Sequence, residues 1–182
     1  IPGLVNLDGG IIVANSVNTS TANQGATPGT ATFYFNGGTL KARANSATFF
    51  QGRTTTPITP INAYVTARGA VIDSDTFNIA FLEPLLTDPN LLGAADGGLR
   101  KFGTGTLTMA GTNTYIGDTL VGAGTLLDNG QSLSAVIVSN SATLGGNGVI
   151  SSNVTVNVGG TLAPGANGIG VLTVGGNVGL AG

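Results

Sequence analysis

The chain is 182 residues long, with 31 Gly, 41% hydrophobic residues, only 8% charged residues and a net charge of −2. This hydrophobic content excludes a disordered chain, and glycine without a three-residue period excludes a collagen helix. The small net charge gives the chain no evident attraction to nucleic acid or to an anionic membrane, and its Thr, Asn, Val, Leu and Gly content is typical of short strands joined by tight turns.

The sequence of the first half of the chain predicts strands that are interrupted by two loops. Thr32-Phe33-Tyr34-Phe35 has the composition of a strand. Residues 51–62 contain two Pro and are expected to form an inserted loop, because Pro cannot donate to a central strand ladder. Residues 81–98 contain two more Pro and are expected to form a second excursion or a short helical turn. From residue 99 onward the strand pattern is uninterrupted.

The second half of the chain contains a repeat. The dipeptide Thr-Leu follows small residues five times, and the last four copies recur at a nearly constant interval of about 18 residues. A coil in which each turn, or rung, is built from a few short strands accounts for this regularity. At about 18–20 residues a rung, the chain would form roughly nine rungs. The five copies begin at Thr39, Thr106, Thr125, Thr143 and Thr161.

Alternation and turn residues support the same architecture. Val154-Thr155-Val156-Asn157-Val158 places its valines on one face of a strand. Asn-Gly and Asp-Gly dipeptides mark tight turns, and the regular Thr-Leu period favours corners of a coil over hairpin tips. The sequence therefore predicts an all-β solenoid with irregular rungs and inserted loops over residues 1–98 and regular rungs over residues 99–182. The dipeptides lie at 8–9, 36–37, 96–97, 129–130, 147–148 and 167–168.

One segment resembles a known family. Residues 99–115 read Leu-Arg-Lys-Phe-Gly-Thr-Gly-Thr-Leu-Thr-Met-Ala-Gly-Thr-Asn-Thr-Tyr, which resembles the opening of the passenger-associated transport repeat, or autotransporter-associated β-strand repeat. Residues 117–126 are similar to the second strand pair of that repeat. Residues 160–174 resemble a segment that follows such repeats, and residues 69–79 resemble the spacer that precedes them in large surface proteins. The resemblance extends over about residues 30–180 and implies a right-handed parallel β-helix, export across two bacterial membranes, and a role at the cell surface.

Catalytic and metal chemistry is poorly supported by the composition. The chain has no His and no Cys, so neither a Ser-His-Asp triad nor the usual zinc, copper or iron ligand sets can be assembled from it. No phosphate-loop pattern is present. We therefore expect no catalytic residue, no cofactor, no metal site and no enzymatic activity, and the resemblance carries over no catalytic residue either.

Four carboxylates form the one candidate for glycan cleavage. Asp73 and Asp75 alternate onto the same strand face, and Glu83 and Asp88 follow nearby. Glycoside cleavage needs two carboxylates about 5–10 Å apart, and an incidental calcium contact is a second alternative. The interpretation that we prefer is structural: Asp73-Ser74-Asp75 closes a turn.

Basic and aromatic residues provide two further candidates. Arg100-Lys101 beside Phe102 is too small a basic group for nucleic-acid binding, and both side chains are expected at the solvated edge of a rung. Phe49-Phe50 and Tyr64 are expected to pack against the core or beneath a loop, with sugar stacking as the alternative.

Two functions of different classes compete. The first is a structural segment of an extracellular or cell-surface protein, acting as a stalk or as a fibre subunit whose rungs stack end to end on neighbouring copies. The second is an adhesin module that binds a surface glycan or protein receptor through the loops at 51–62 and 81–98. A polysaccharide lyase or hydrolase is third.

The two ends of the chain bear on the first function. Neither end shows a charged or Pro-rich cap, so we expect a fragment that continues lengthwise, with Val174 and Val178 inward at the C-terminal end. The sequence contains no apolar run long enough to predict a membrane-spanning helix.

Overall fold

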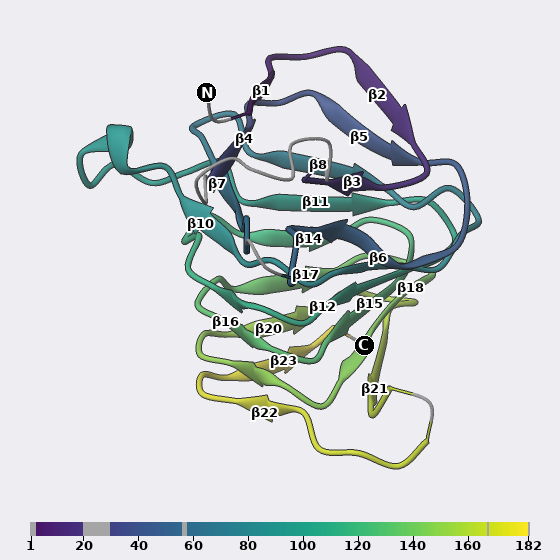
Figure 1. The fold of residues 1–182 in the computed structure, drawn as a ribbon. Helices are drawn as coiled ribbons and strands as arrows, with labels where there is room; N and C mark the ends of the chain where they lie inside the picture. The colour runs from purple at the N-terminus through teal and green to yellow at the C-terminus, as the bar shows by residue number, and fades with distance from the viewer. Residues whose placement is uncertain (1–2, 20–29, 56–57, 167, 182) are drawn as a thin grey trace.

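The chain folds into a stack of parallel strands. The computed structural model describes residues 3–19, 30–55, 58–166 and 168–181, and within this part of the chain the one helical element is the short 3-10 helix η1 (Pro89–Leu91). Every pairing between the described strands is parallel. The strands stack from the purple N-terminal end to the yellow C-terminal end (Figure 1). The prediction of an all-β parallel solenoid is confirmed.

The strands form four sheets, which we name A to D. Sheet A comprises β1 (Leu4–Leu7), β4 (Ala31–Phe35), β7 (Ile61–Val65) and β10 (Leu85–Thr87). Sheet B comprises β2 (Ile11–Ala14), β5 (Thr39–Ala42), β8 (Ala70–Asp73), β11 (Leu99–Phe102), β14 (Thr119–Val121), β17 (Val136–Val138), β20 (Val154–Val156) and β23 (Val178–Leu180). Sheet C comprises β3 (Val17–Asn18), β6 (Ser46–Gln51), β9 (Ile79–Phe81), β12 (Thr106–Met109), β15 (Gly124–Asp128), β18 (Ala142–Gly146) and β21 (Thr161–Pro164). Sheet D comprises β13 (Thr112–Asn113), β16 (Gln131–Ser132), β19 (Val149–Ile150) and β22 (Thr173–Val174).

Each rung from β1 to β21 contributes one strand to sheet A or D, one to sheet B and one to sheet C, and the last described rung contributes β22 to sheet D and β23 to sheet B. Sheet D continues below sheet A, because Thr114 N donates to Leu85 O at 2.9 Å. Sheet B has eight strands, which makes eight rungs in the described part of the chain, where the spacing predicted roughly nine. The difference comes from rung length. The turn of chain that separates the paired residues Thr39 and Val71 is almost twice as long as the turn that separates Thr119 and Val136.

The Thr-Leu copies occupy two different sheets. The last four lie in sheet C, where Leu107, Leu126, Leu144 and Leu162 are partners in successive strands. This confirms the predicted period in the second half of the chain. The Thr39-Leu40 copy, which stands outside the regular spacing, lies in β5 of sheet B instead.

The turn dipeptides lie at corners, as predicted. Asn36-Gly37, Asn129-Gly130 and Asn147-Gly148 each connect strands of different parallel sheets. Gly37 has a φ of +85°, a conformation that favours glycine because it has no Cβ. The Asn-Gly pair at 167–168 includes a residue outside the described part of the chain.

The two expected loops are present, and both are shorter than predicted, since Gln51 belongs to β6 and the first two residues of β7 lie within the predicted 51–62 loop. The chain leaves the coil between β6 and β7, where Arg53 and Thr59 form an isolated antiparallel bridge; residues 56–57 lie outside the described residues. The second loop was expected over residues 81–98, but Leu85–Thr87 pair with β7 as strand β10. The Pro residues on either side of β10 do not interrupt it, so the excursion is confined to residues 88–98. It contains η1 and protrudes at the left of Figure 1.

One apolar core runs inside the stack, and its composition changes along it. In the first rungs it consists largely of aromatic rings: the centroids of Phe50 and Phe81 are 4.8 Å apart, and those of Phe33 and Phe35 are 4.5 Å apart. From β14 onward the buried hydrophobic strand residues are aliphatic. They are Val121, Leu126, Val136, Val138, Ala142, Leu144, Ile150, Val154 and Val156.

Candidate functional site: buried charges at two corners

Lys101 is buried in the interior of the solenoid. Leu99 and Lys101 point inward from β11, while Arg100 and Phe102 point outward. Lys101 is the strand partner of Ile72 in the rung above and of Val121 in the rung below, both of which point into the core. It therefore takes the place of an aliphatic core residue in this column of inward side chains, and none of its surface is exposed. The prediction that this lysine lies at a solvated edge was therefore wrong, whereas the neighbouring arginine is exposed.

Five oxygen atoms surround the Lys101 ammonium group. Nζ donates to Ser74 Oγ at 2.9 Å, to the carbonyl oxygens of Phe102 and Gly103 at 3.2 and 2.6 Å, and to those of Gly105 and Ala123 at 2.7 and 2.9 Å. An ammonium group has three donors, so it shares them among these acceptors. All five acceptors are uncharged and lie at the corner between sheets B and C.

Burial has the expected effect on this amine. It lowers the pKa of Lys101 to about 8, and the charge of Asp73 partly opposes the shift. At neutral pH the group is therefore protonated, with backbone and hydroxyl dipoles in place of the water that solvates an exposed lysine.

Asp73 and Asp75 lie on the outer side of the same corner. Lys41 Nζ lies 3.0 Å from a carboxylate oxygen of each, and these hydrogen bonds, first that to Asp73, raise the pKa of Lys41. Asp73 Oδ1 also accepts from Asp75 N at 2.8 Å, and Asp75 has a φ of +52°. The two carboxylates thus share one cation at a turn, in the arrangement expected for turn closure.

The other two candidate carboxylates bind elsewhere. Glu83 Oε1 accepts from Gly52 N at 2.8 Å and so holds the loop after β6 against the next rung. Asp88 caps η1, where its Oδ1 accepts from Asn90 N at 2.9 Å and from the Asn90 side-chain amide at 2.8 Å. Each acid is engaged locally, and no hydrogen bond or ion pair joins Glu83 or Asp88 to the Asp73–Asp75 pair in the described part of the chain.

Asp96 is a buried charge at a different corner, ahead of β11. It is 5% exposed and accepts four hydrogen bonds. Oδ1 accepts from Gly98 N at 3.0 Å and Gly117 N at 2.9 Å, and Oδ2 accepts from Ile116 N at 2.9 Å and Thr87 Oγ1 at 2.7 Å. This carboxylate closes the base of the 88–98 excursion. The turn pattern predicted a corner at 96–97, but not a buried anion held by backbone N–H groups.

A chain of hydroxyl groups crosses the core beside β14. Tyr115 is buried, and its OH lies 2.6 Å from Thr119 Oγ1, which lies 2.7 Å from Ser134 Oγ. Burial raises the pKa of Tyr115 to about 12, while the two hydroxyl contacts oppose the shift. Burial also raises the pKa of Asp128, which accepts hydrogen bonds from the Ser132 hydroxyl and from Gly130 N.

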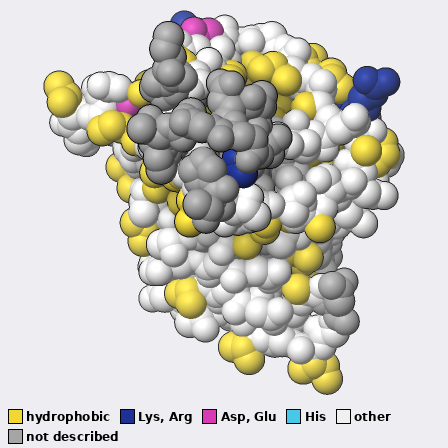
Figure 2. Space-filling view, viewed as in Figure 1, with side chains coloured by type: hydrophobic (Ala, Val, Ile, Leu, Met, Phe, Trp, Pro, Cys, Tyr) yellow, Lys and Arg dark blue, Asp and Glu magenta, His cyan; other side chains and the backbone are white. Residues whose placement is uncertain are grey.

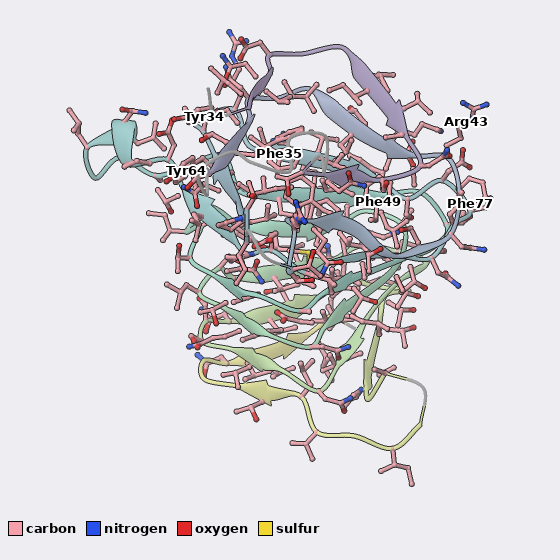
Figure 3. The ribbon with its side chains drawn as sticks, viewed as in Figure 1. Tyr34, Phe35, Arg43, Phe49, Tyr64 and Phe77 are labelled. Carbon is pink, nitrogen blue, oxygen red and sulfur yellow. The ribbon has the colours of Figure 1, made fainter. Side chains whose placement is uncertain are left out.

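The aromatic candidates pack within the protein. Phe49 and Phe50 are fully buried, so the alternative that they stack on a sugar is wrong. Tyr64 stacks on Tyr34 with ring centroids 5.4 Å apart (Figure 3), so the two rings face each other along the sheet.

Metal-binding clusters and membrane-spanning helices are both absent from the residues that the structure describes. Among them, no group of three or more Asp, Glu, His or Cys side chains is placed to hold a metal ion. None of the helical structure there is long and apolar enough to cross a membrane.

Comparison with known proteins places one repeat on the chain. The model of the passenger-associated-transport-repeat matches residues 99–127, which span β11 to β15 and include Lys101 and Tyr115. A protein of Serratia marcescens named extracellular serine protease is 47% identical over 78 residues, or 43% of this chain and 7% of the relative. A second protein with that name and source is 52% identical over 50 residues, or 28% of this chain and 5% of the relative. The chain thus spans under a tenth of the length of these relatives. No solved structure matches the chain.

Proposed function

We propose that this chain is a non-catalytic structural segment of a secreted or cell-surface protein, because residues 99–127 are a passenger-associated transport repeat of autotransporters. In this proposal it serves as a length of solenoid stalk, and its end rungs stack on further rungs of the same kind. The name of the Serratia relatives supports export from the cell. Their protease activity is not carried over, because the chain has no His for a serine-protease triad.

The observation that carries the proposal is that the core-facing side chains of the last strand in sheet B are exposed. Val154 and Val156 of β20 are 0% and 5% exposed, whereas their partners Val178 and Leu180 in β23 are 46% and 72% exposed. In the part of the chain that the structure describes, β21, β22 and β23 are each the last strand of their sheet, so their outer edges face no further strand there. One more rung would pair with these edges and cover both side chains.

Surface charge favours contact at the same end. From residue 102 onward the only ionisable side chains are Asp118, Asp128 and the buried Tyr115. In Figure 2 the lower, C-terminal part of the molecule shows hydrophobic and uncharged polar side chains, and the visible Lys, Arg, Asp and Glu side chains lie higher. Rungs can therefore approach this end without repulsion between like charges.

Charge placed into the exposed end of the column tests the proposal. We expect the wild-type chain to form elongated rods in electron micrographs and to increase in mass with concentration in sedimentation. Val178→Lys and Val174→Lys put an unpaired charge where the next rung would cover it, and they should leave the particles short. Thr155→Lys is the matched control, because residue 155 points outward from β20, and it should form rods like the wild type.

Two outcomes would count against stacking. A wild-type chain that stays monomeric at high concentration would refute end-to-end stacking between copies and leave a stalk within one longer polypeptide. Rods of equal length in Val178→Lys and the wild type would show that the contact lies elsewhere.

An adhesin is the second candidate function, and the 88–98 excursion favours it. Leu92 follows η1 with a φ of +50°, and its side chain is 93% exposed. A bulky residue held in this conformation at an exposed tip is unusual and often has a functional cause. Leu92→Ser should reduce cell or matrix binding without lowering stability if the excursion is a binding loop.

A further inference from the structure

The oxygen atoms around Lys101 come from three successive rungs. Ser74 belongs to the corner after β8, and Phe102, Gly103 and Gly105 belong to the corner after β11 itself. Ala123 belongs to the corner between β14 and β15. One side chain therefore bonds to the rung above, to its own rung and to the rung below. Within the described part of the chain, Lys101 is the one buried lysine or arginine.

The arrangement fits a primary ammonium group. The five Nζ–oxygen distances are 2.6–3.2 Å, the range of charge-assisted and ordinary N–H···O bonds. All acceptors are neutral, so the positive charge is balanced by converging dipoles, much as carbonyl rings replace the hydration shell of an ion in a channel filter. An ammonium group has three N–H donors to share among these five acceptors, whereas a neutral amine has two.

The charged residues around this corner do not compete for the site. Asp73 and Asp75 lie on the outer side, where both bind Lys41. In the rung below, residues 121–124 carry no ionisable side chain, and residues 102–105 of the same rung as Lys101 carry none either. The ammonium group thus has no carboxylate in direct contact, and the oxygen cage is its principal partner.

We propose that the corner formed by residues 74, 102–105 and 123 is a binding site for a primary ammonium group, which Lys101 occupies as an internal ligand. The occupied site fixes three consecutive rungs relative to one another. This proposal deepens the structural function and does not depend on stacking at the chain ends, because the site lies mid-chain and exists in a single copy.

The site also lies where the rungs become shorter. Above it, Ala70 of β8 is the partner of Leu99 of β11. Below it, Leu99 is the partner of Thr119 of β14, and this second turn of chain is shorter than the first. Rungs of unequal length cannot be aligned by repetition alone, so a bonded centre shared by all three supplies the alignment at this corner.

Chemical rescue tests the site directly. Lys101→Ala vacates the ammonium position and leaves a channel where the side chain lay. We expect its urea unfolding midpoint to be below that of the wild type in sodium chloride, and to rise in equimolar ammonium or methylammonium chloride, because a bound ligand stabilises the folded state. The wild type and Lys41→Ala should each keep the same midpoint in all three salts, since Lys41 is partly exposed and binds carboxylates.

The result that would overturn the proposal is an unchanged midpoint of Lys101→Ala across the three salts. If this variant folds in no salt, Lys101→Met decides. The thioether fills the channel without an ammonium group, so wild-type stability of Lys101→Met would refute the site, and a lowered midpoint would support it.

Amine labelling gives an independent measurement on the unmodified chain. The chain has two lysines, Lys41 and Lys101, so peptide mass spectrometry resolves each one. We expect an amine-reactive ester to acylate Lys41 at least about 100-fold faster than Lys101, because Lys101 reacts only when its corner opens. Labelling of Lys101 should follow the unfolding of β11 and its neighbours in urea, and equal labelling rates in native buffer would refute the proposal.

Discussion

The rungs above and below the Lys101 corner build the same coil from different cores. Above it, long turns of chain separate successive sheet B partners, and the rings of Phe33, Phe35, Phe50 and Phe81 fill the interior. Below it, the partners follow one another at shorter and nearly equal intervals as far as β20. Val, Leu, Ile and Ala replace the Phe rings there, and Tyr115 is buried among them. All the Lys and Arg residues and all the Phe residues lie at or before position 102.

This difference shows how one fold accepts both variable and repetitive sequence. Strand pairing is satisfied rung by rung, so a rung tolerates a long excursion provided that its strands return to register. The upper rungs use this freedom, with a loop after β6 and an excursion after β10. The lower rungs as far as β20 do not use it. Their stability depends on many small contacts that repeat at every rung, whereas that of the upper rungs depends on a few large contacts between rings.

The largest expected effect comes from removing one ring of the upper core. Phe81 is fully buried and its ring faces those of Phe35, Phe49 and Phe50. Phe81→Ala should lower the free energy of unfolding by about 3–5 kcal/mol, and Leu144→Ala in the lower core by about 2–4 kcal/mol. Urea unfolding followed by circular dichroism measures both. A larger loss for Leu144→Ala would reverse the comparison between the two cores.

The sequence predicted the lower rungs better than the upper ones, for a physical reason. Leu107, Leu126 and Leu144 recur at the rung period because each rung there has nearly the same length, so spacing alone reveals sheet C. In the upper rungs the insertions remove the period, so spacing did not reveal the sheet of Thr39-Leu40, and β10 was mistaken for part of a loop.

The sequence analysis missed the buried charge of Lys101 because it relied on the usual exposure of lysine and not on the position of this residue in the strand. Alternation in β11 places Lys101 on the same face as Leu99, and that signal was present in the sequence. A lone lysine is usually solvated, however, and the oxygen atoms that hold it come from three corners that are distant in the chain. Such convergence becomes visible only when the rungs are stacked. The interpretation of Asp73 and Asp75 as turn residues needed only local pattern, and it agrees with their geometry.

The second expected effect tests whether the 88–98 excursion is fastened to the coil by its buried anion. Asp96→Asn keeps the shape but replaces one acceptor oxygen with a donor amide, so two of its four hydrogen bonds lose their acceptor. We expect a loss on the order of 3 kcal/mol, and faster proteolysis of residues 88–98. Asp118→Asn at the exposed neighbouring corner is the control and should change neither measurement.

A smaller effect is the pH dependence of the free energy of unfolding, to which Tyr115 and Lys101 contribute with opposite signs. The raised pKa of Tyr115, about 12 against 10.0 in the unfolded chain, means that the folded state retains a proton which the unfolded state loses. Stability should therefore fall as pH rises from about 10 to 12. Lys101, whose pKa is lowered to about 8, contributes in the opposite direction between about 8 and 10.5.

The variants Tyr115→Phe and Lys101→Met separate these two contributions. Tyr115→Phe should cost about 1–2 kcal/mol at neutral pH through the lost Thr119 contact, and it should remove the fall in stability between pH 10 and 12. Lys101→Met should remove the rise between pH 8 and 10.5. If the unfolding free energy of Tyr115→Phe still falls as in the wild type, another group is responsible for the alkaline transition.

The smallest effect belongs to the acid pair that glycan cleavage would require. Asp73→Ala removes one of the two carboxylates at Lys41 and the acceptor of Asp75 N, and Asp75→Ala removes the other carboxylate. Each contact is partly exposed to solvent, so each variant should lose at most about 1–2 kcal/mol of unfolding free energy.

Because Lys41 holds both acids, neither is placed to act as a proton donor, and we expect no glycan-cleaving rate in the wild type or in either variant. A reducing-sugar assay on polysaccharide substrates makes the measurement, and Asp118→Ala serves as the matched control. A rate that is present in the wild type and in Asp118→Ala but lost in Asp73→Ala would overturn the structural interpretation of this corner. It would place catalysis in the upper, irregular rungs.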